Sequence, residues 1–159
     1  MRTKLRLLQG CLLLAILVLF TGCPPPHCEG PDPRAMEIRY SLISSSSPFT
    51  GTVRIAGVVS NWGLSPFESS QGQQSVLLYE GDELVGQQDF SELPVNGAVE
   101  VTYERTWNIA EEFRQTSYTV IVDYDPDIFI DGNPNNDDCN LADNDLTRSS
   151  AGLDALFEP

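Results

Sequence analysis

The chain has 159 residues, of which 23 are acidic and 9 are basic, so its formal net charge is −14. Nucleic acids and anionic lipid headgroups are bound by clustered Lys and Arg, and this composition therefore argues against either as a partner. The length suits one domain, and the apolar content is sufficient for a single core. A charge spread along the chain otherwise serves solubility.

Residues 1–22 have the pattern of a secretory signal peptide. Basic residues Arg2, Lys4 and Arg6 precede the apolar run CLLLAILVLF, and small residues follow it. A membrane-spanning helix needs about 20 apolar residues, so this run is too short to cross a bilayer. We expect cleavage after Gly22, which leaves 9 − 3 = 6 basic residues against 23 acidic ones and a net charge of −17.

The segment LFTGC, residues 19–23, resembles the bacterial lipobox, although Phe20 stands where that pattern usually has Leu. The resemblance implies that Cys23 is lipidated and becomes the first residue of the mature chain. Two or more acyl chains hold a protein stably on a membrane. The proline-rich residues 23–34 would then form an extended tether. The alternative is an ordinary signal peptide followed by an unmodified Cys23.

Two cysteines remain once Cys11 leaves with the signal peptide and Cys23 is acylated, namely Cys28 and Cys139. An even number of cysteines in an exported chain indicates a disulfide. Such a bond would close a loop of about 110 residues and stabilise the fold by roughly 4–5 kcal/mol on the chain-entropy model. Two free thiols are the alternative.

Residues 35–150 are predicted to form one all-β domain, because short runs of alternating apolar and polar residues are separated by turn residues. Alternation places Met36, Ile38, Tyr40 and Leu42 on the buried face of the first strand. Further strands are expected at residues 52–61, 75–80, 84–90, 99–107 and 117–124. The last of these is the most apolar and should be central.

About seven antiparallel strands in this length favour an immunoglobulin-like sandwich, with an antiparallel barrel as the alternative. Residues 151–159 are expected to be a loosely packed tail, although Leu153, Leu156 and Phe157 have the spacing of one helical turn.

Several of these segments resemble CARDB, the cell-adhesion-related domain found in bacteria. The matching positions are Asn61 and Gly63, Tyr79–Gly86, Leu93–Gly97 and Val122–Asn136. The chain departs from the family pattern at Asp131, where Glu is usual, and in the additional segment DDCNLADND at 137–145. The resemblance implies a seven-stranded sandwich that serves structure or adhesion in exported bacterial proteins rather than catalysis.

In a sandwich of this topology, successive strands run in opposite directions, so every second loop lies at the same end. The start of the first strand then lies beside the loops at 60–74, 91–98 and 124–145. A disulfide between Cys28 and Cys139 is therefore topologically reasonable, provided that their Cα atoms approach within about 7 Å.

The stretch 123–145 holds eight aspartates and five asparagines, and it is a candidate calcium site. Hard divalent cations bind six to eight oxygens, which Asp and Asn supply at alternate positions of calcium loops. The candidate ligands are Asp125, Asp127, Asp131, Asn133, Asn135 and Asp137. The run also resembles thrombospondin type 3 calcium repeats, whereas an EF-hand starting at Asp131 fails at Asn136 and Ala142. The alternatives are turn formation alone and recognition without calcium.

No enzymatic activity is expected. The only histidine, His27, lies in the tether, and the sequence has no phosphate-binding glycine loop, nucleophile elbow or zinc spacing. No cofactor is required, with calcium as the one candidate. Trp62, near Phe67, is a candidate for stacking on sugars, although such aromatics more often fill a core.

The sequence therefore predicts a membrane-anchored, non-enzymatic binding or adhesion lipoprotein of the bacterial cell envelope. Position 24 is Pro and not the Asp that retains some lipoproteins in the inner membrane, which favours the outer membrane or cell surface. Expected partners are the membrane, through the lipid, and an envelope protein or glycan. The alternatives are a calcium-dependent carbohydrate-binding lipoprotein and a purely structural component of envelope assembly.

Overall fold

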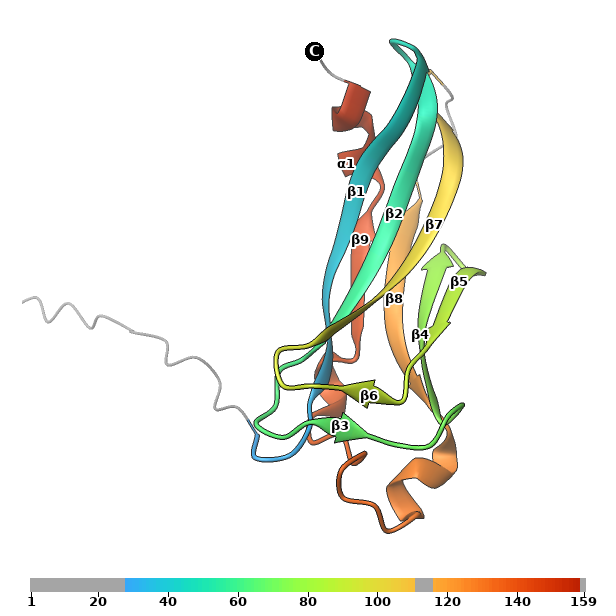
Figure 1. Ribbon diagram of the computed structural model, residues 1–159. Helices are drawn as coiled ribbons and strands as arrows, with labels where there is room; N and C mark the ends of the chain where they lie inside the picture. The colour runs from blue at the N-terminus through green and yellow to red at the C-terminus, as the bar shows by residue number, and fades with distance from the viewer. Residues whose placement is uncertain (1–27, 111–115, 158–159) are drawn as a thin grey trace, which may run out of the picture.

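The computed structural model describes residues 28–110 and 116–157 (Figure 1). The expected signal peptide and Cys23 lie outside the described residues. In the described part of the chain, no helix is long and apolar enough to span a membrane.

The described residues form nine strands and four short helical turns. The strands are β1 (Pro33–Ser47), β2 (Thr50–Asn61), β3 (Phe67–Glu68), β4 (Gln74–Glu80), β5 (Glu83–Asp89), β6 (Glu92–Leu93), β7 (Ala98–Asn108), β8 (Ser117–Tyr124) and β9 (Asp145–Ser149). The helical turns are η1 (Pro126–Ile130), η2 (Leu141–Asp143), α1 (Ala151–Asp154) and η3 (Ala155–Phe157).

The strands pack as an antiparallel sandwich, as expected. One sheet has the order β1-β2-β7 and the other β5-β4-β8-β9, while β3 and β6 pair with each other. The two larger sheets face one another along the length of the molecule (Figure 1). Strand β8 lies between β4 and β9, so the prediction that the most apolar strand is internal to its sheet is confirmed.

The core lies between the sheets and consists of every second residue of the inner strands. On β2, Val53, Ile55 and Val59 are fully buried, as the alternation predicted. The facing side chains come mainly from β4 and β8: Val76, Leu78, Tyr118, Val120 and Val122. Burial of each such side chain contributes about 1.5–3 kcal/mol, so this alternation is the main source of stability.

Strand β1 departs from the expected alternation at Met36. Ala35 pairs with Val59 and Glu37 with Val58, so Met36 is the extra residue of a β-bulge and is 38% exposed. A second register shift follows Leu42, which is 37% exposed. The prediction that Met36 faces the core is therefore wrong, because the bulge takes it out of the alternation that Ile38 and Tyr40 follow. Leu42 keeps that alternation and pairs with the buried Val53, although it is partly exposed.

The domain begins before residue 35. Pro31, Asp32 and Pro33 are buried, and β1 starts at Pro33. The predicted tether at 23–34 is therefore too long, because residues 28–34 are packed on the sandwich.

The C-terminal segment also belongs to the core. Leu153 in α1 is fully buried, and the indole Nε1 of Trp107 donates a hydrogen bond of 2.9 Å to Asp154. The expectation of a loosely packed tail is wrong for this turn, since Leu153 fills the space between the sheets at that end.

Candidate functional site

Four segments gather at one end of the sandwich, which we call the loop end. Its segments are residues 28–32, 62–66, 94–97 and 125–144. The backbone N–H of Trp62 donates to the carbonyl of Asp32 at 2.8 Å, and that of Cys139 donates to Pro31 at 3.1 Å. The shared end predicted from the topology is therefore confirmed, and the β1–β2 turn lies at the opposite end (Figure 1).

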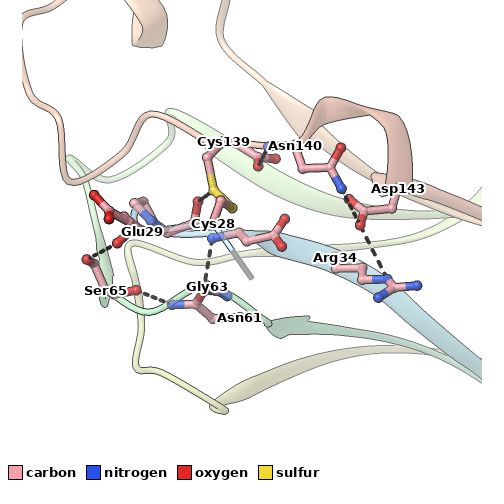
Figure 2. The surroundings of a disulfide bond; sticks show 12 residues. Cys28, Glu29, Arg34, Asn61, Gly63, Ser65, Cys139, Asn140 and Asp143 are labelled. Carbon is pink, nitrogen blue, oxygen red and sulfur yellow. Dashed lines mark hydrogen bonds and ion pairs between the residues drawn. A yellow bond between two sulfur atoms is a disulfide. The ribbon is translucent and has the colours of Figure 1, made fainter. Parts of the chain in front are cut away.

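A disulfide joins Cys28 to Cys139 at the loop end (Figure 2). The two Cα atoms are 6.3 Å apart and the residues are 111 positions apart in the sequence. The expected pairing is present in the structure. It fixes the acidic loop to the segment that leads into β1.

Asn61 is the polar centre of the loop end and is fully buried. Its Oδ1 accepts hydrogen bonds from the backbone N–H groups of Asp32 and Gly63, both at 3.0 Å. Its Nδ2 donates to the carbonyls of Ser65 at 2.8 Å and Leu93 at 2.9 Å. One side chain thus connects segments 28–32 and 62–66 to the end of β6, which explains why an asparagine ends β2.

Gly63 allows the N-terminal segment to cross the loop after β2 at close range. A Cβ atom at this position would lie 2.2 Å from the carbonyl oxygen of Gly30 and 2.7 Å from the amide nitrogen of Asp32. Both are backbone atoms, so no side-chain movement relieves the contact. The Asn-x-Gly pattern noted in the sequence therefore holds the N-terminal segment against the loop after β2. The sequence marked these two residues only through the family resemblance and did not indicate their role.

The first half of the acidic loop uses its side-chain oxygens to shape the backbone. Asp125 accepts a hydrogen bond from the N–H of Asp127 at 3.1 Å, and the same contact joins Asp131 to Asn133 at 2.7 Å and Asn133 to Asn135 at 3.1 Å. These are Asx turns, in which a side chain bonds the amide two residues ahead. Each oxygen keeps a second lone pair.

Of the candidate calcium ligands, Asp131, Asn133 and Asn135 are linked to one another through Asx turns. The Asn136 side chain donates to Asp131 at 2.8 Å, and this contact holds the pKa of the Asp131 carboxyl below its usual range. In the described part of the chain, Cys28, Asp32 and Cys139 form the one group of three potential metal ligands whose ligand atoms all lie within 4.8 Å, and its two thiols form the disulfide. Calcium binding by the six candidate residues stays a prediction.

The second half of the acidic loop contains two buried side chains, those of Asp138 and Asn144. The carboxylate of Asp138 accepts hydrogen bonds from the Tyr124 hydroxyl and the Asn140 N–H, both at 2.9 Å. Asp143 accepts from the Asn140 side chain at 2.7 Å and pairs with Arg34 at 3.4 Å (Figure 2). Burial raises the pKa of both the Asp138 and the Asp143 carboxyl. These residues lie in the segment that departs from the family pattern.

Trp62 is half-buried at the loop end, with the Arg34 guanidinium carbon 5.8 Å from the ring centroid. The cation therefore covers one face of the ring, where a sugar would stack. Phe67, expected in the loop beside it, is fully buried in the core, where its ring packs against Phe90 and Tyr124. Sugar binding by Trp62 stays a prediction.

Comparison with known proteins gives structural neighbours only, because no family model and no curated protein matches the chain. The fold is similar to the crystal structure of a CARDB domain from Pyrococcus furiosus, solved in complex with di-metal ions. The TM-score is 0.51, with 16% identity over 79% of this chain and 91% of that chain. It is also similar to the solution structure of a domain from a candidate cell surface protein of Methanosarcina acetivorans, with TM-score 0.45 and 17% identity over 76% of this chain and 90% of that one. The first likeness shows that the chain has a CARDB-like fold.

Proposed function

We propose that this chain is a lipid-anchored, non-enzymatic binding or adhesion module of the bacterial cell envelope. The observation that carries the proposal is the position of the N-terminal segment relative to the two ends of the sandwich. Residue 28, the first described residue, lies at the loop end, and the β1–β2 turn lies at the opposite end (Figure 1). An anchor at Cys23 would therefore hold the loop end near the membrane and direct the β1–β2 turn away from it.

The spacing between anchor and domain supports a short, defined attachment. Cys28 follows Cys23 by five positions, and an extended proline-rich chain spans roughly 3 Å per residue, so the gap is about 15 Å. Because the disulfide and the buried segment 31–33 secure the chain from residue 28 onward, force on the anchor reaches a packed part of the domain.

The β1–β2 turn has the composition of a contact surface. Residues 41–52 contain no charged side chain, although the chain as a whole is strongly acidic. Within this stretch, Ile43 is 46% exposed and Phe49 is 58% exposed. Exposed apolar side chains in an uncharged stretch suit a protein partner, and aromatic residues are enriched in the cores of protein interfaces.

Anchoring is tested by fractionating cells that express the chain or its Cys23→Ser variant. Cys23→Ser is expected to leave the membrane fraction and to lose the mass of the acyl chains from the N-terminal peptide. Cys11→Ser is the matched control, because Cys11 lies within the proposed signal peptide. An unchanged distribution of Cys23→Ser would contradict the anchor.

Binding at the β1–β2 turn is tested by photo-crosslinking in intact cells. A photoactivatable phenylalanine analogue replaces Phe49 in one strain and Leu64, an exposed residue of the loop end, in another. A discrete crosslinked species is expected from position 49 and not from position 64. Equal crosslinking at both positions, or none at 49, would refute a binding surface at this turn.

A further inference from the structure

The β1–β2 turn is an ordered structure that holds apolar side chains in solvent. Strand pairing continues to Ser47 and Thr50, the last pair of the hairpin. The Ser46 hydroxyl donates a hydrogen bond of 3.0 Å to the Thr50 carbonyl, and the Phe49 N–H donates one of 3.2 Å to the Ser47 hydroxyl. Ile43 and Phe49 are nevertheless exposed. Because the backbone that carries them is already ordered, a contact with them costs little conformational entropy.

Strand β1 has an open edge beside this turn. Within the described residues, β1 is the outer strand of its sheet and pairs only with β2. Its first half contacts β9 on the open side, where Arg148 donates to the Ile38 carbonyl and the Tyr40 hydroxyl donates to the Ser149 carbonyl at 3.0 Å. Residues 41–47 come next and are all exposed. An exposed strand edge of this kind is a site at which another polypeptide can bind.

Two bulges limit the kind of contact that this edge can make. Ile43 and Ser46 are extra residues relative to β2, at two register shifts of β1. A bulge interrupts the regular hydrogen-bonding pattern of a strand, so open-ended strand pairing is disfavoured. The contact therefore depends on side chains, and a closed pair is favoured over a fibre.

The chemistry of the turn matches a second copy of the same turn. Residues 41–52 are Ser, Thr, Leu, Ile, Phe, Pro and Gly only. A hydroxyl group both donates and accepts hydrogen bonds, so Ser and Thr side chains can pair with their own copies, as apolar side chains can. Because the stretch has no charged residue, two copies of it can meet without placing like charges within it opposite each other.

Strand β5 provides the contrast. It is the outer strand of the other sheet, and its end residues Glu83 and Asp89 are both exposed. Antiparallel approach of two copies along β5 would bring Glu83 of one copy near Asp89 of the other, and like charges placed opposite each other are destabilising. This acidic chain can therefore meet its own copy at the β1–β2 turn with less repulsion than at β5.

We propose that the β1–β2 turn binds the same turn of a second copy of this chain in a two-fold contact. The inference rests on the proposed binding role of this turn and names its partner. A two-fold contact uses the same surface on both copies, as these self-complementary residues require. Few apolar side chains take part, so the pair is weak in solution, and a membrane anchor strengthens it by raising the effective concentration of the copies.

Photo-crosslinking of the purified full chain tests this pairing in the absence of other proteins. The photoactivatable phenylalanine analogue replaces Phe49, and chains grown on natural and on heavy nitrogen are mixed before irradiation. The whole turn lies in one tryptic peptide, residues 40–54, because trypsin cleaves after Arg39 and Arg54. Crosslinks that join a light copy of this peptide to a heavy copy are expected, whereas the analogue in place of Leu64 should give none.

Charge variants at Ile43 distinguish pairing of two copies from other contacts. Ile43→Asp should lower the light–heavy crosslink roughly tenfold or more, because like charges then meet, and Ile43→Arg should do the same. A mixture of the two variants should restore the crosslink, since opposite charges attract, and this recovery also shows that both variants fold. Leu84→Asp, an equally exposed position on β5, is the matched control and should change the crosslink less than about twofold.

Crosslinks confined to single copies, or a mixture of the two Ile43 variants that crosslinks no better than either variant alone, would overturn the pairing. If position 49 captures a different protein in cells while the purified chain gives no light–heavy product, the turn remains a binding surface and only the pairing of copies is wrong. Absence of any crosslink from position 49, in cells and in the purified chain, would refute both proposals.

Discussion

Replacing Asn61 with alanine is expected to remove four hydrogen bonds from the loop end in a single step. The variant leaves the N–H groups of Asp32 and Gly63 and the carbonyls of Ser65 and Leu93 without their partner. Each bond contributes about 1 kcal/mol net, so the free energy of unfolding should fall by about 4 kcal/mol. This is a large share of the roughly 5–15 kcal/mol that stabilises a domain.

Equilibrium unfolding in guanidinium chloride under oxidising conditions measures this loss as a shift of the midpoint at constant slope. Asn108→Ala is the matched control, because the Asn108 side chain accepts one hydrogen bond, from Ala110, at an exposed position. The control should cost less than about 1 kcal/mol. A loss for Asn61→Ala no larger than that of the control would refute the role of Asn61 as the central connection of the loop end.

Three further predictions concern the disulfide, the C-terminal turn and the buried acid. Replacing Cys28 and Cys139 together with serine should lower the free energy of unfolding by about 4–5 kcal/mol, and a thermal melt that hardly moves would show that packing alone secures residues 28–33. Leu153→Ala should cost about 2–5 kcal/mol in denaturant, and a cost near zero would place α1 outside the core. Burial raises the folded-state pKa of Asp138, so its contribution to stability is present below the unfolded-state pKa and lost as pH rises through the folded-state pKa. In chelator, Asp138→Asn should therefore stabilise the chain more at pH 7 than at acidic pH, and parallel pH profiles from thermal melts would contradict this.

The sandwich could be predicted because its strands follow the two-residue period of a sheet with one buried face. Val53, Ile55 and Val59 occupy alternate positions and are buried together. Met36 fits the same period but is exposed, because a β-bulge shifts the register at this position. A bulge adds one residue without changing the local composition, so alternation alone does not reveal it. Leu153 was missed for a different reason, since one apolar turn near a terminus resembles a mobile tail.

The shared end of Cys28 and Cys139 could be predicted because it depends on topology, whereas the bond itself also requires the short Cα separation that the structure has. Short turns make successive strands alternate in direction, which brings Cys28 and Cys139 to the same end whatever the details of the loops.

The chemistry of the acidic loop could not be predicted in the same way. Asx turns and calcium ligands both place Asp or Asn at every second residue, so Asp131 and Asn133 satisfy either pattern. The pattern in sequence gives no measure of burial, which is what distinguishes Asn144 from its exposed neighbours.

The contacts that hold the loop end together carry no net charge, whereas the acidic loop that they hold is rich in carboxylates. Like charges that fold together repel, and a free loop would relieve the repulsion by moving away. The disulfide, the bonds of Asn61 and the close crossing at Gly63 carry no net charge, so neither pH nor salt weakens them directly. They therefore keep the carboxylates of the acidic loop, including the buried Asp138, in place against this repulsion.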